Sequence, residues 1–222
     1  GEVVEAGGQV EPQPRAQGVR EALQQLRERI LGVSSAVLNI GELARHQGLP
    51  AERMLLERVE EALAVLRGLS ETDLKLVRKV LDTITSGQEL DLRRFGSVTA
   101  PLKSGTPNLI ALQNDAELDD YTYRVAGCVG EFWTRLCLEE LPGAFAEGTV
   151  ERLQLERGVR FGKGLQLVNI LRDLPRDLQQ GRCYIPSERV LKEGGYEGGG
   201  AMWAYDLPAP FLVIATQNPV EQ

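Results

Sequence analysis

Histidine, cysteine and aromatic residues are scarce in this chain of 222 residues. The shortages of histidine and cysteine each argue against particular kinds of site. His46 is the only histidine, which argues against histidine-rich metal sites and against a Ser-His-Asp triad. The three cysteines form no CxxC pair, which favours a reduced, cytosolic setting. Because oxygen ligands are what remains, any bound metal is expected to be Mg²⁺ or Mn²⁺.

Long apolar runs and an excess of positive charge are also lacking. No run approaches the roughly 18 apolar residues that a membrane-spanning helix needs, and nothing resembles a signal peptide. The formal net charge of −7 argues against nucleic acid as the main partner. These absences predict a cytoplasmic protein. They leave open a peripheral contact with a membrane, and they do not determine the oligomeric state.

Leucine, alanine, glutamate and arginine dominate the periodic segments, and this composition predicts an all-α fold. Apolar residues at three- and four-residue steps predict five helices, over about 19–43, 50–66, 70–95, 119–140 and 149–173. Pro50 is expected at a first helical position, and Ser70 with Asp73 resembles a capping box. Pro175 is expected to bend or end the last helix.

The two ends of the chain differ in composition from the periodic part. Residues 1–18 are rich in Gly, Pro, Gln and Glu, which predicts a disordered lead-in. Residues 191–222 contain a glycine-rich linker and a short apolar run, 211–216, that has the pattern of a strand. A lone strand is not stable by itself. We therefore expect one helical domain, residues 19–190, and a non-helical tail that does not belong to it.

Four polar residues recur at steps of three, four and four, which places them on one face of a helix: Gln166, Asn169, Asp173 and Asp177. Two carboxylates one turn apart, with amide oxygens beside them, suit Mg²⁺, which usually bridges to substrate phosphates. Three arginines close in sequence could contact diphosphate oxygens directly: Arg172, Arg176 and Arg182.

An isolated DxxxD pattern is more often a solvated helix face than a metal site. Here apolar residues between 165 and 171 surround the polar face almost completely. A helix that is apolar nearly all round is expected to be buried, and buried carboxylates need a cation or a hydrogen-bond donor. The neighbours therefore favour the metal site.

Three stretches carry a resemblance to the squalene and phytoene synthases. FGKGLQLVNILRDLPRDLQQGRCYIP, from Phe161 to Pro186, resembles their second aspartate-rich signature, and DDYTYRVAGCVGEFWTRLC, from Asp119 to Cys137, resembles their other signature. GQELDLRRF, from Gly87 to Phe95, is similar to the intervening helix. The resemblance spans about residues 38–190. It implies an isoprenoid-synthase-like helical bundle and a prenyltransferase that condenses two farnesyl-type diphosphates head to head.

The resemblance also implies roles for individual residues. Asp173 and Asp177 would bind Mg²⁺ on a prenyl diphosphate, and the substrate would be bound by Gln166, Asn169, Arg172 and Arg182. Tyr121 matches the family tyrosine near the developing carbocation, although by itself it would be interpreted as a packed aromatic residue. The product would be squalene, formed through a cyclopropyl diphosphate with NADPH as hydride donor, or a carotenoid precursor. The residues of these signatures favour squalene as the product.

Small residues in the stretch from Asp119 to Cys137 have two interpretations. Ala126, Gly127 and Gly130 could leave room for an isoprenoid tail, or they could allow two helices to pack closely. The sequence does not distinguish between the two.

The chain departs from the family pattern on both sides of these signatures. The place of the first aspartate-rich motif is taken by Asn39-Ile40-Gly41-Glu42-Leu43, in which Glu42 is the only acid. Further helices that normally follow the second signature are not recognisable, so we expect a truncated bundle. The segment from Leu207 to Gln222 instead resembles the sensor strand of MoxR-type AAA+ ATPases, without any GxxxxGKT-type phosphate loop.

Two alternatives to an active synthase follow from these departures. The first is a catalytically inactive protein that binds a prenyl diphosphate or a partner protein, and residues 39–43 favour it. The second is an ATPase fragment with a helical insertion, and only the C-terminal segment favours it.

Overall fold

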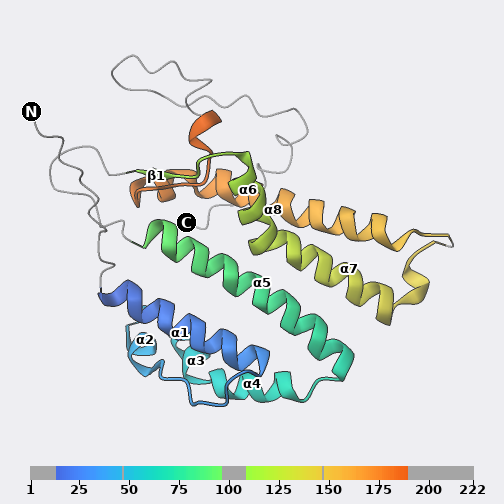
Figure 1. Cartoon of the computed structure of the whole chain (residues 1–222), viewed down its shortest axis with the longest axis horizontal. Coiled ribbons are helices and arrows are strands. Elements are labelled where there is room, and N and C mark those ends of the chain that lie inside the picture. The colour runs from blue at the N-terminus through green and yellow to red at the C-terminus, as the bar shows by residue number, and fades with distance from the viewer. Residues whose placement is uncertain (1–13, 47, 97–108, 147, 190–222) are drawn as a thin grey trace, which may run out of the picture. The chain divides into compact units, whose positions relative to one another are not determined.

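The computed structural model describes residues 14–46, 48–96, 109–146 and 148–189. These residues are predominantly helical and form two compact units, one before and one after the boundary between Ser97 and Val98 (Figure 1). The predicted all-α fold is confirmed. In these ranges, no helix combines the length and the apolar character needed to cross a bilayer. The predicted tail and its strand at 211–216 lie outside the described residues.

The first unit contains α1 (Pro14–Leu31), α2 (Gly41–Arg45), α3 (Pro50–Glu57), α4 (Val59–Arg67) and α5 (Glu71–Phe95). The two long helices α1 and α5 lie side by side (Figure 1). An aliphatic cluster forms the core of this unit, with buried side chains from α1, α4 and the segment between α1 and α2: Ala22, Ile30, Leu38, Ile40, Leu63 and Leu66.

Two helix starts in the first unit agree with the prediction. Pro50 occupies the first turn of α3, where its missing N–H removes no helical hydrogen bond. Ser70 caps α5, because its hydroxyl accepts the backbone N–H of Asp73 at 3.1 Å. The predicted second helix is divided at Arg58 into α3 and α4.

The first predicted helix is wrong at both ends. α1 begins at Pro14, before the predicted Val19, and it ends at Leu31 instead of continuing to about residue 43. Gly32 follows with a φ of 76°, and the N–H of Val33 reaches the carbonyl of Glu28 at 2.9 Å, which closes the helix end. The chain then turns Leu38 into the aliphatic cluster.

The second unit consists of β1 (Ile110–Ala111), α6 (Asp115–Thr122), the π-helical turn η1 (Tyr123–Gly127), α7 (Cys128–Glu140), the 3₁₀ turn η2 (Pro142–Ala144), α8 (Glu151–Gln179) and β2 (Arg182–Cys183). α6, η1 and α7 follow one another without a break, and α7 lies along α8 (Figure 1). β1 and β2 pair in parallel, with Ile110 opposite Arg182 and Ala111 opposite Cys183.

Two predictions for the last helix are corrected. The helix does not end near Asp173, because α8 continues through Pro175 to Gln179. It is also not buried nearly all round, since Phe161 is 68% exposed and Leu165 is 47% exposed. Ile170 is buried, so α8 has one buried side and one exposed side in this stretch.

Close packing of η1 and α7 on α8 explains the small residues in the stretch from Asp119 to Cys137. A Cβ atom at Gly162 would collide with the carbonyl oxygen of Ala126, and one at Gly158 would lie 2.6 Å from the carbonyl oxygen of Gly130. We call Gly130, Gly158 and Gly162 the glycine seam. Of the two interpretations of these small residues, the structure shows close helix packing.

Candidate functional site

The predicted site residues on the last helix lie together in the second unit. Gln166, Asn169, Asp173 and Asp177 all belong to α8, because the helix continues past Pro175. Their spacing on one continuous helix places them along one face, which we call the aspartate face. The Nδ2 of Asn169 donates a hydrogen bond to the Oε1 of Gln166 at 3.4 Å.

Asp173 is held in an ion pair with its neighbour in sequence. Arg172 donates from Nε to Oδ1 at 2.9 Å and from Nη2 to Oδ2 at 2.8 Å, and both side chains are about half exposed. The hydrogen bonds and the charge of Arg172 hold the pKa of Asp173 below its ordinary value of 3.8. Asp173 is therefore ionised at neutral pH, as a metal ligand must be.

Asp177 is more deeply placed and pairs with a residue beyond the helix. Gly181, with a φ of 75°, turns the chain after α8, so that Arg182 comes back to Asp177. The Nη2 of Arg182 lies 2.8 Å from the Oδ1 of Asp177, whose side chain is only 13% exposed. In the described part of the chain, the Nε of Arg182 is buried without an acceptor. A buried N–H of a guanidinium favours an added acceptor such as a phosphate oxygen.

The donor set of the aspartate face fits Mg²⁺ that is bound together with phosphate. Mg²⁺ commonly takes one or two carboxylates and completes its shell with water and substrate phosphates. Among the described residues, no group of three or more His, Cys, Asp or Glu side chains could hold a metal by itself. The carboxylates of α8 therefore suit a shared complex with a phosphate ligand and not a closed metal site made by the protein alone.

Tyr121 lies on α6 and is buried, with 7% of its surface exposed. Its ring stacks on that of Tyr184, with 4.6 Å between the ring centroids. This stacking ties α6 to the segment that follows β2. The structure therefore shows the packed aromatic residue expected from the sequence alone, and the role of Tyr121 near a carbocation stays a prediction.

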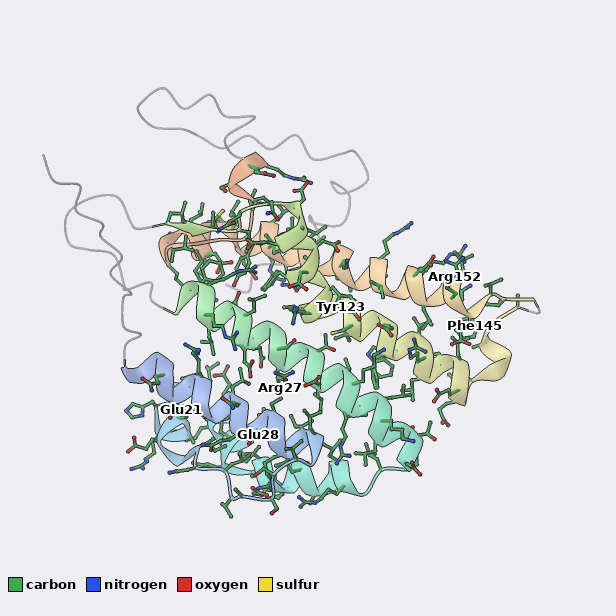
Figure 2. The ribbon with its side chains drawn as sticks, in the orientation of Figure 1. Glu21, Arg27, Glu28, Tyr123, Phe145 and Arg152 are labelled. Carbon is green, nitrogen blue, oxygen red and sulfur yellow. The ribbon has the colours of Figure 1, made fainter. Side chains whose placement is uncertain are left out.

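Polar residues that the sequence did not single out connect α6 and η1 to α8. The Nζ of Lys163 donates to the Oδ1 of Asp119 at 2.6 Å and lies 5.7 Å from the ring centroid of Tyr123, which is labelled in Figure 2. The hydroxyl of Tyr123 donates to Glu131 at 2.9 Å, and burial together with this bond raises the pKa of Tyr123 to about 12. Because Lys163 and Asp119 are far apart in sequence, no local pattern could have indicated this pair.

The segment at the place of the first aspartate-rich motif lies in the first unit and has a structural use. Ile40 is buried in the aliphatic cluster, and Leu43 packs against it. Asn39 and Glu42 are exposed, and the side chain of Glu42 lies 3.8 Å from that of Arg45. The apolar residues of 39–43 therefore serve the core, and the segment offers a single exposed carboxylate.

Comparison with known proteins identifies similar sequences. Residues 4–202 match the family described as squalene/phytoene synthase. A presqualene diphosphate synthase of Rhodopseudomonas palustris is 32% identical over 181 residues, which cover 82% of this chain and 48% of that protein. A bifunctional lycopene cyclase/phytoene synthase of Arthroderma gypseum is 34% identical over 122 residues, or 54% of this chain and 18% of that protein.

A phytoene synthase of Thermus thermophilus is 34% identical over 85 residues, which cover 38% of this chain and 26% of that protein. The chain thus spans less than half the length of each of these three relatives.

Proposed function

The chain belongs to the squalene/phytoene synthase family, and we propose that it acts in the head-to-head condensation of two prenyl diphosphates. The observation that carries this proposal is the aspartate face, which remains on one continuous helix because α8 passes through Pro175. A face with two carboxylates, two amides and flanking arginines suits a diphosphate bound with Mg²⁺.

Each residue of the site has a defined task in this proposal. Asp173 and Asp177 would hold Mg²⁺ with the diphosphate of one substrate, and the bound ion would neutralise the leaving diphosphate. Arg182 would add a hydrogen bond to a phosphate oxygen through its buried Nε. Gln166 and Asn169, which are hydrogen-bonded to each other, would orient the bound group with their amides.

We propose a squalene-type product in preference to a carotenoid precursor. The relative that is matched over 82% of this chain is named a presqualene diphosphate synthase, and this supports the preference. Presqualene diphosphate has the cyclopropyl ring expected for the intermediate. NADPH would be needed only if this chain also carried out the reduction to squalene.

The test compares two variants of α8 in incubations with farnesyl diphosphate and Mg²⁺, with and without NADPH. Asp173→Asn removes one carboxylate of the aspartate face, and we expect product formation to fall at least about a hundredfold. The control is Glu156→Gln, which removes an exposed carboxylate paired with Arg152, labelled in Figure 2, near the start of the same helix. Mass spectrometry of the organic extract measures the products.

Equal activity in the two variants would overturn the assignment of the aspartate face. Presqualene diphosphate or squalene from the unaltered chain, lost in Asp173→Asn and kept in Glu156→Gln, would support both the reaction and the site. In a parallel incubation with geranylgeranyl diphosphate, formation of phytoene in place of the squalene-type product would correct the choice of product.

A second candidate is a protein that binds a prenyl diphosphate without converting it. The segment 39–43 favours this candidate, because its apolar residues pack on the aliphatic cluster and a single exposed acid remains. Binding of farnesyl diphosphate that depends on Mg²⁺ and on Asp173, without any product, would support this candidate over the synthase.

A further inference from the structure

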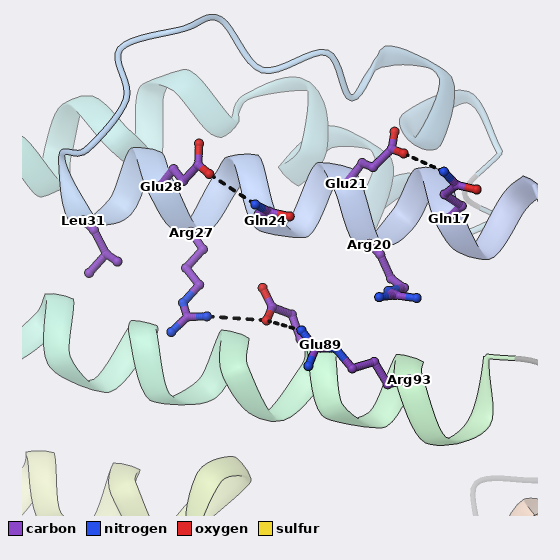
Figure 3. Close-up of a pocket in the computed structure, with 9 residues that line it drawn as sticks. All are labelled: Gln17, Arg20, Glu21, Gln24, Arg27, Glu28, Leu31, Glu89 and Arg93. Carbon is purple, nitrogen blue, oxygen red and sulfur yellow. Dashed lines mark hydrogen bonds and ion pairs between the residues drawn. The ribbon is translucent and has the colours of Figure 1, made fainter. Parts of the chain in front are cut away.

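A groove of about 640 Å³ runs between α1 and α5, within the first unit (Figure 3). Its volume is in the range of sites that bind small molecules. Both of its walls are long helices of one unit, so its shape does not depend on the second unit. The aspartate face lies on α8, and none of its residues lines this groove.

The charged side chains of α1 that line the groove point in two different directions. Figure 3 shows Arg20 and Arg27 extending from α1 toward α5, whereas Glu21 and Glu28 point away from α5. These two carboxylates have partners on their own helix: Gln17 donates to Glu21 at 3.1 Å, and Gln24 donates to Glu28 at 3.4 Å. The acidic residues of α1 therefore lie at the outer edge of the groove, and its arginines face inward.

One of the inward arginines is already neutralised. Arg27 donates to Asp82 at 2.6 Å and to Glu89 at 3.4 Å, and these interactions raise the pKa of Arg27 above its ordinary value. Glu89 is mostly buried, with 16% of its side chain exposed, and it also lies 3.8 Å from Arg93. Glu89 is thus shared between Arg27 and Arg93.

Arg20 is the inward arginine for which the described residues provide no partner. Across the residues that the structure describes, its guanidinium forms neither a hydrogen bond nor an ion pair, although its side chain is partly buried. Partial burial without a partner costs free energy for a charged group, and a bound anion would remove that cost. Arg20, Arg27 and Arg93 line the groove together with Glu21, Glu28 and Glu89, so the lining charges balance. Arg20 is distinguished by having no partner among the described residues, and not by an excess of positive charge.

We propose that this groove binds a phosphate or diphosphate group directly through Arg20 and Arg93, without a metal ion. Guanidinium groups match phosphate oxygens with paired hydrogen bonds, so this contact needs no metal ion. The source of the group is either free diphosphate or the head of a prenyl diphosphate. This proposal concerns binding alone and does not require an active synthase.

The test is isothermal titration calorimetry of the whole chain in EDTA, with inorganic diphosphate as the probe. We expect saturable binding that weakens as the salt concentration rises. The double variant Arg20→Gln/Arg93→Gln should bind at least about tenfold more weakly, which corresponds to about 1.4 kcal/mol. The matched control is Arg67→Gln, which removes one exposed positive charge from α4 in the same unit.

Further titrations identify the source of the anion and separate this proposal from the synthase. Farnesyl diphosphate that binds more tightly than diphosphate, with farnesol not binding, would identify the prenyl diphosphate head. Tighter binding of diphosphate would identify the free anion. No binding in EDTA, or binding that is lost in Asp173→Asn and kept in the double arginine variant, would overturn the groove. Circular dichroism of the double variant checks its fold. The single variant Arg20→Gln removes no hydrogen bond or ion pair among the described residues, and it should also weaken the binding of diphosphate.

Discussion

The two units hold their long helices together by opposite means. In the first unit, aliphatic side chains from α1, α4 and the segment before α2 fill the space between the helices. In the second unit, η1 and α7 approach α8 so closely at the glycine seam that no side chain fits between the backbones. The first unit therefore depends on the volume of its side chains, whereas the second depends on their absence.

The polar contacts between helices also differ between the two units. In the first unit, Arg29 is 7% exposed and reaches from α1 to Glu60 on α4 at 2.5 Å. In the second, the contacts of Lys163 and Tyr123 lie beside the glycine seam and join helices that the backbone already brings together. We therefore expect a loss of side-chain volume to destabilise the first unit and an addition of side-chain volume at the glycine seam to destabilise the second.

The largest expected effect is the loss of volume in the first unit. Leu63→Ala removes a side chain that is 5% exposed, and we expect the free energy of unfolding to fall by about 3 kcal/mol. Val65→Ala, on the same helix, removes a side chain that is 70% exposed, and it should cost less than about 0.5 kcal/mol. Urea unfolding followed by circular dichroism measures both. Equal losses would mean that the aliphatic cluster does not support this unit.

An added methyl group should be nearly as harmful in the second unit. Gly162→Ala places a Cβ against the carbonyl oxygen of Ala126, which is backbone and cannot rotate away, so we expect a loss of about 2 kcal/mol. Gly164→Ala is the matched control two residues along α8, where a Cβ would meet nothing within 4 Å. It should stabilise the helix by about 0.5–1 kcal/mol. If both alanines stabilised the protein in urea unfolding, close packing at the seam would be refuted.

The smallest expected effect is a dependence on pH in the first unit. The hydrogen bond and charge of Arg29 hold the pKa of Glu60 below its ordinary value of 4.5. Since the folded pKa is lowered, the contribution of Glu60 to stability is present at neutral pH and is lost as the pH falls from about 4.5 through the folded pKa. Glu60→Gln should therefore lower stability at neutral pH and flatten its decline in acid.

Unfolding at a series of pH values from about 7 down to about 3 measures this slope. The control is Glu71→Gln, which removes a carboxylate that is 83% exposed at the start of α5. A slope that is unchanged in Glu60→Gln, or lost equally in Glu71→Gln, would assign the acid sensitivity to other groups.

Local patterns predicted the helices of this chain but not where each one ends. The sequence predicts the cap at Ser70 and the first-turn proline at Pro50 because both act within one turn of a helix. The end of α1 at Leu31 was missed because Gly32 and the burial of Leu38 and Ile40 compete with a helical pattern that continues in the sequence. The continuation of α8 past Pro175 was missed because a proline removes one hydrogen bond without forcing the helix to stop.

In the candidate site too, the sequence predicts the spacing along one helix but not the contacts between separate elements. The spacing of Gln166, Asn169, Asp173 and Asp177 predicts a shared face as soon as the segment is helical. The pairing of Asp177 with Arg182 depends on the turn at Gly181, and the link from Lys163 to Asp119 depends on two helices meeting. The groove that Arg20 and Arg93 line requires α1 and α5 side by side.

The sequence by itself determined the all-α class, the family and the residue types of the aspartate face, since periodicity and spacing act along one helix. Only the tertiary structure decided the rest. It assigned the small residues to helix packing and the apolar residues of 39–43 to the core, and among the described residues it gave Arg20 no partner in the groove. The physical reason is that burial and pairing depend on which surfaces meet, and residues far apart in the chain decide that.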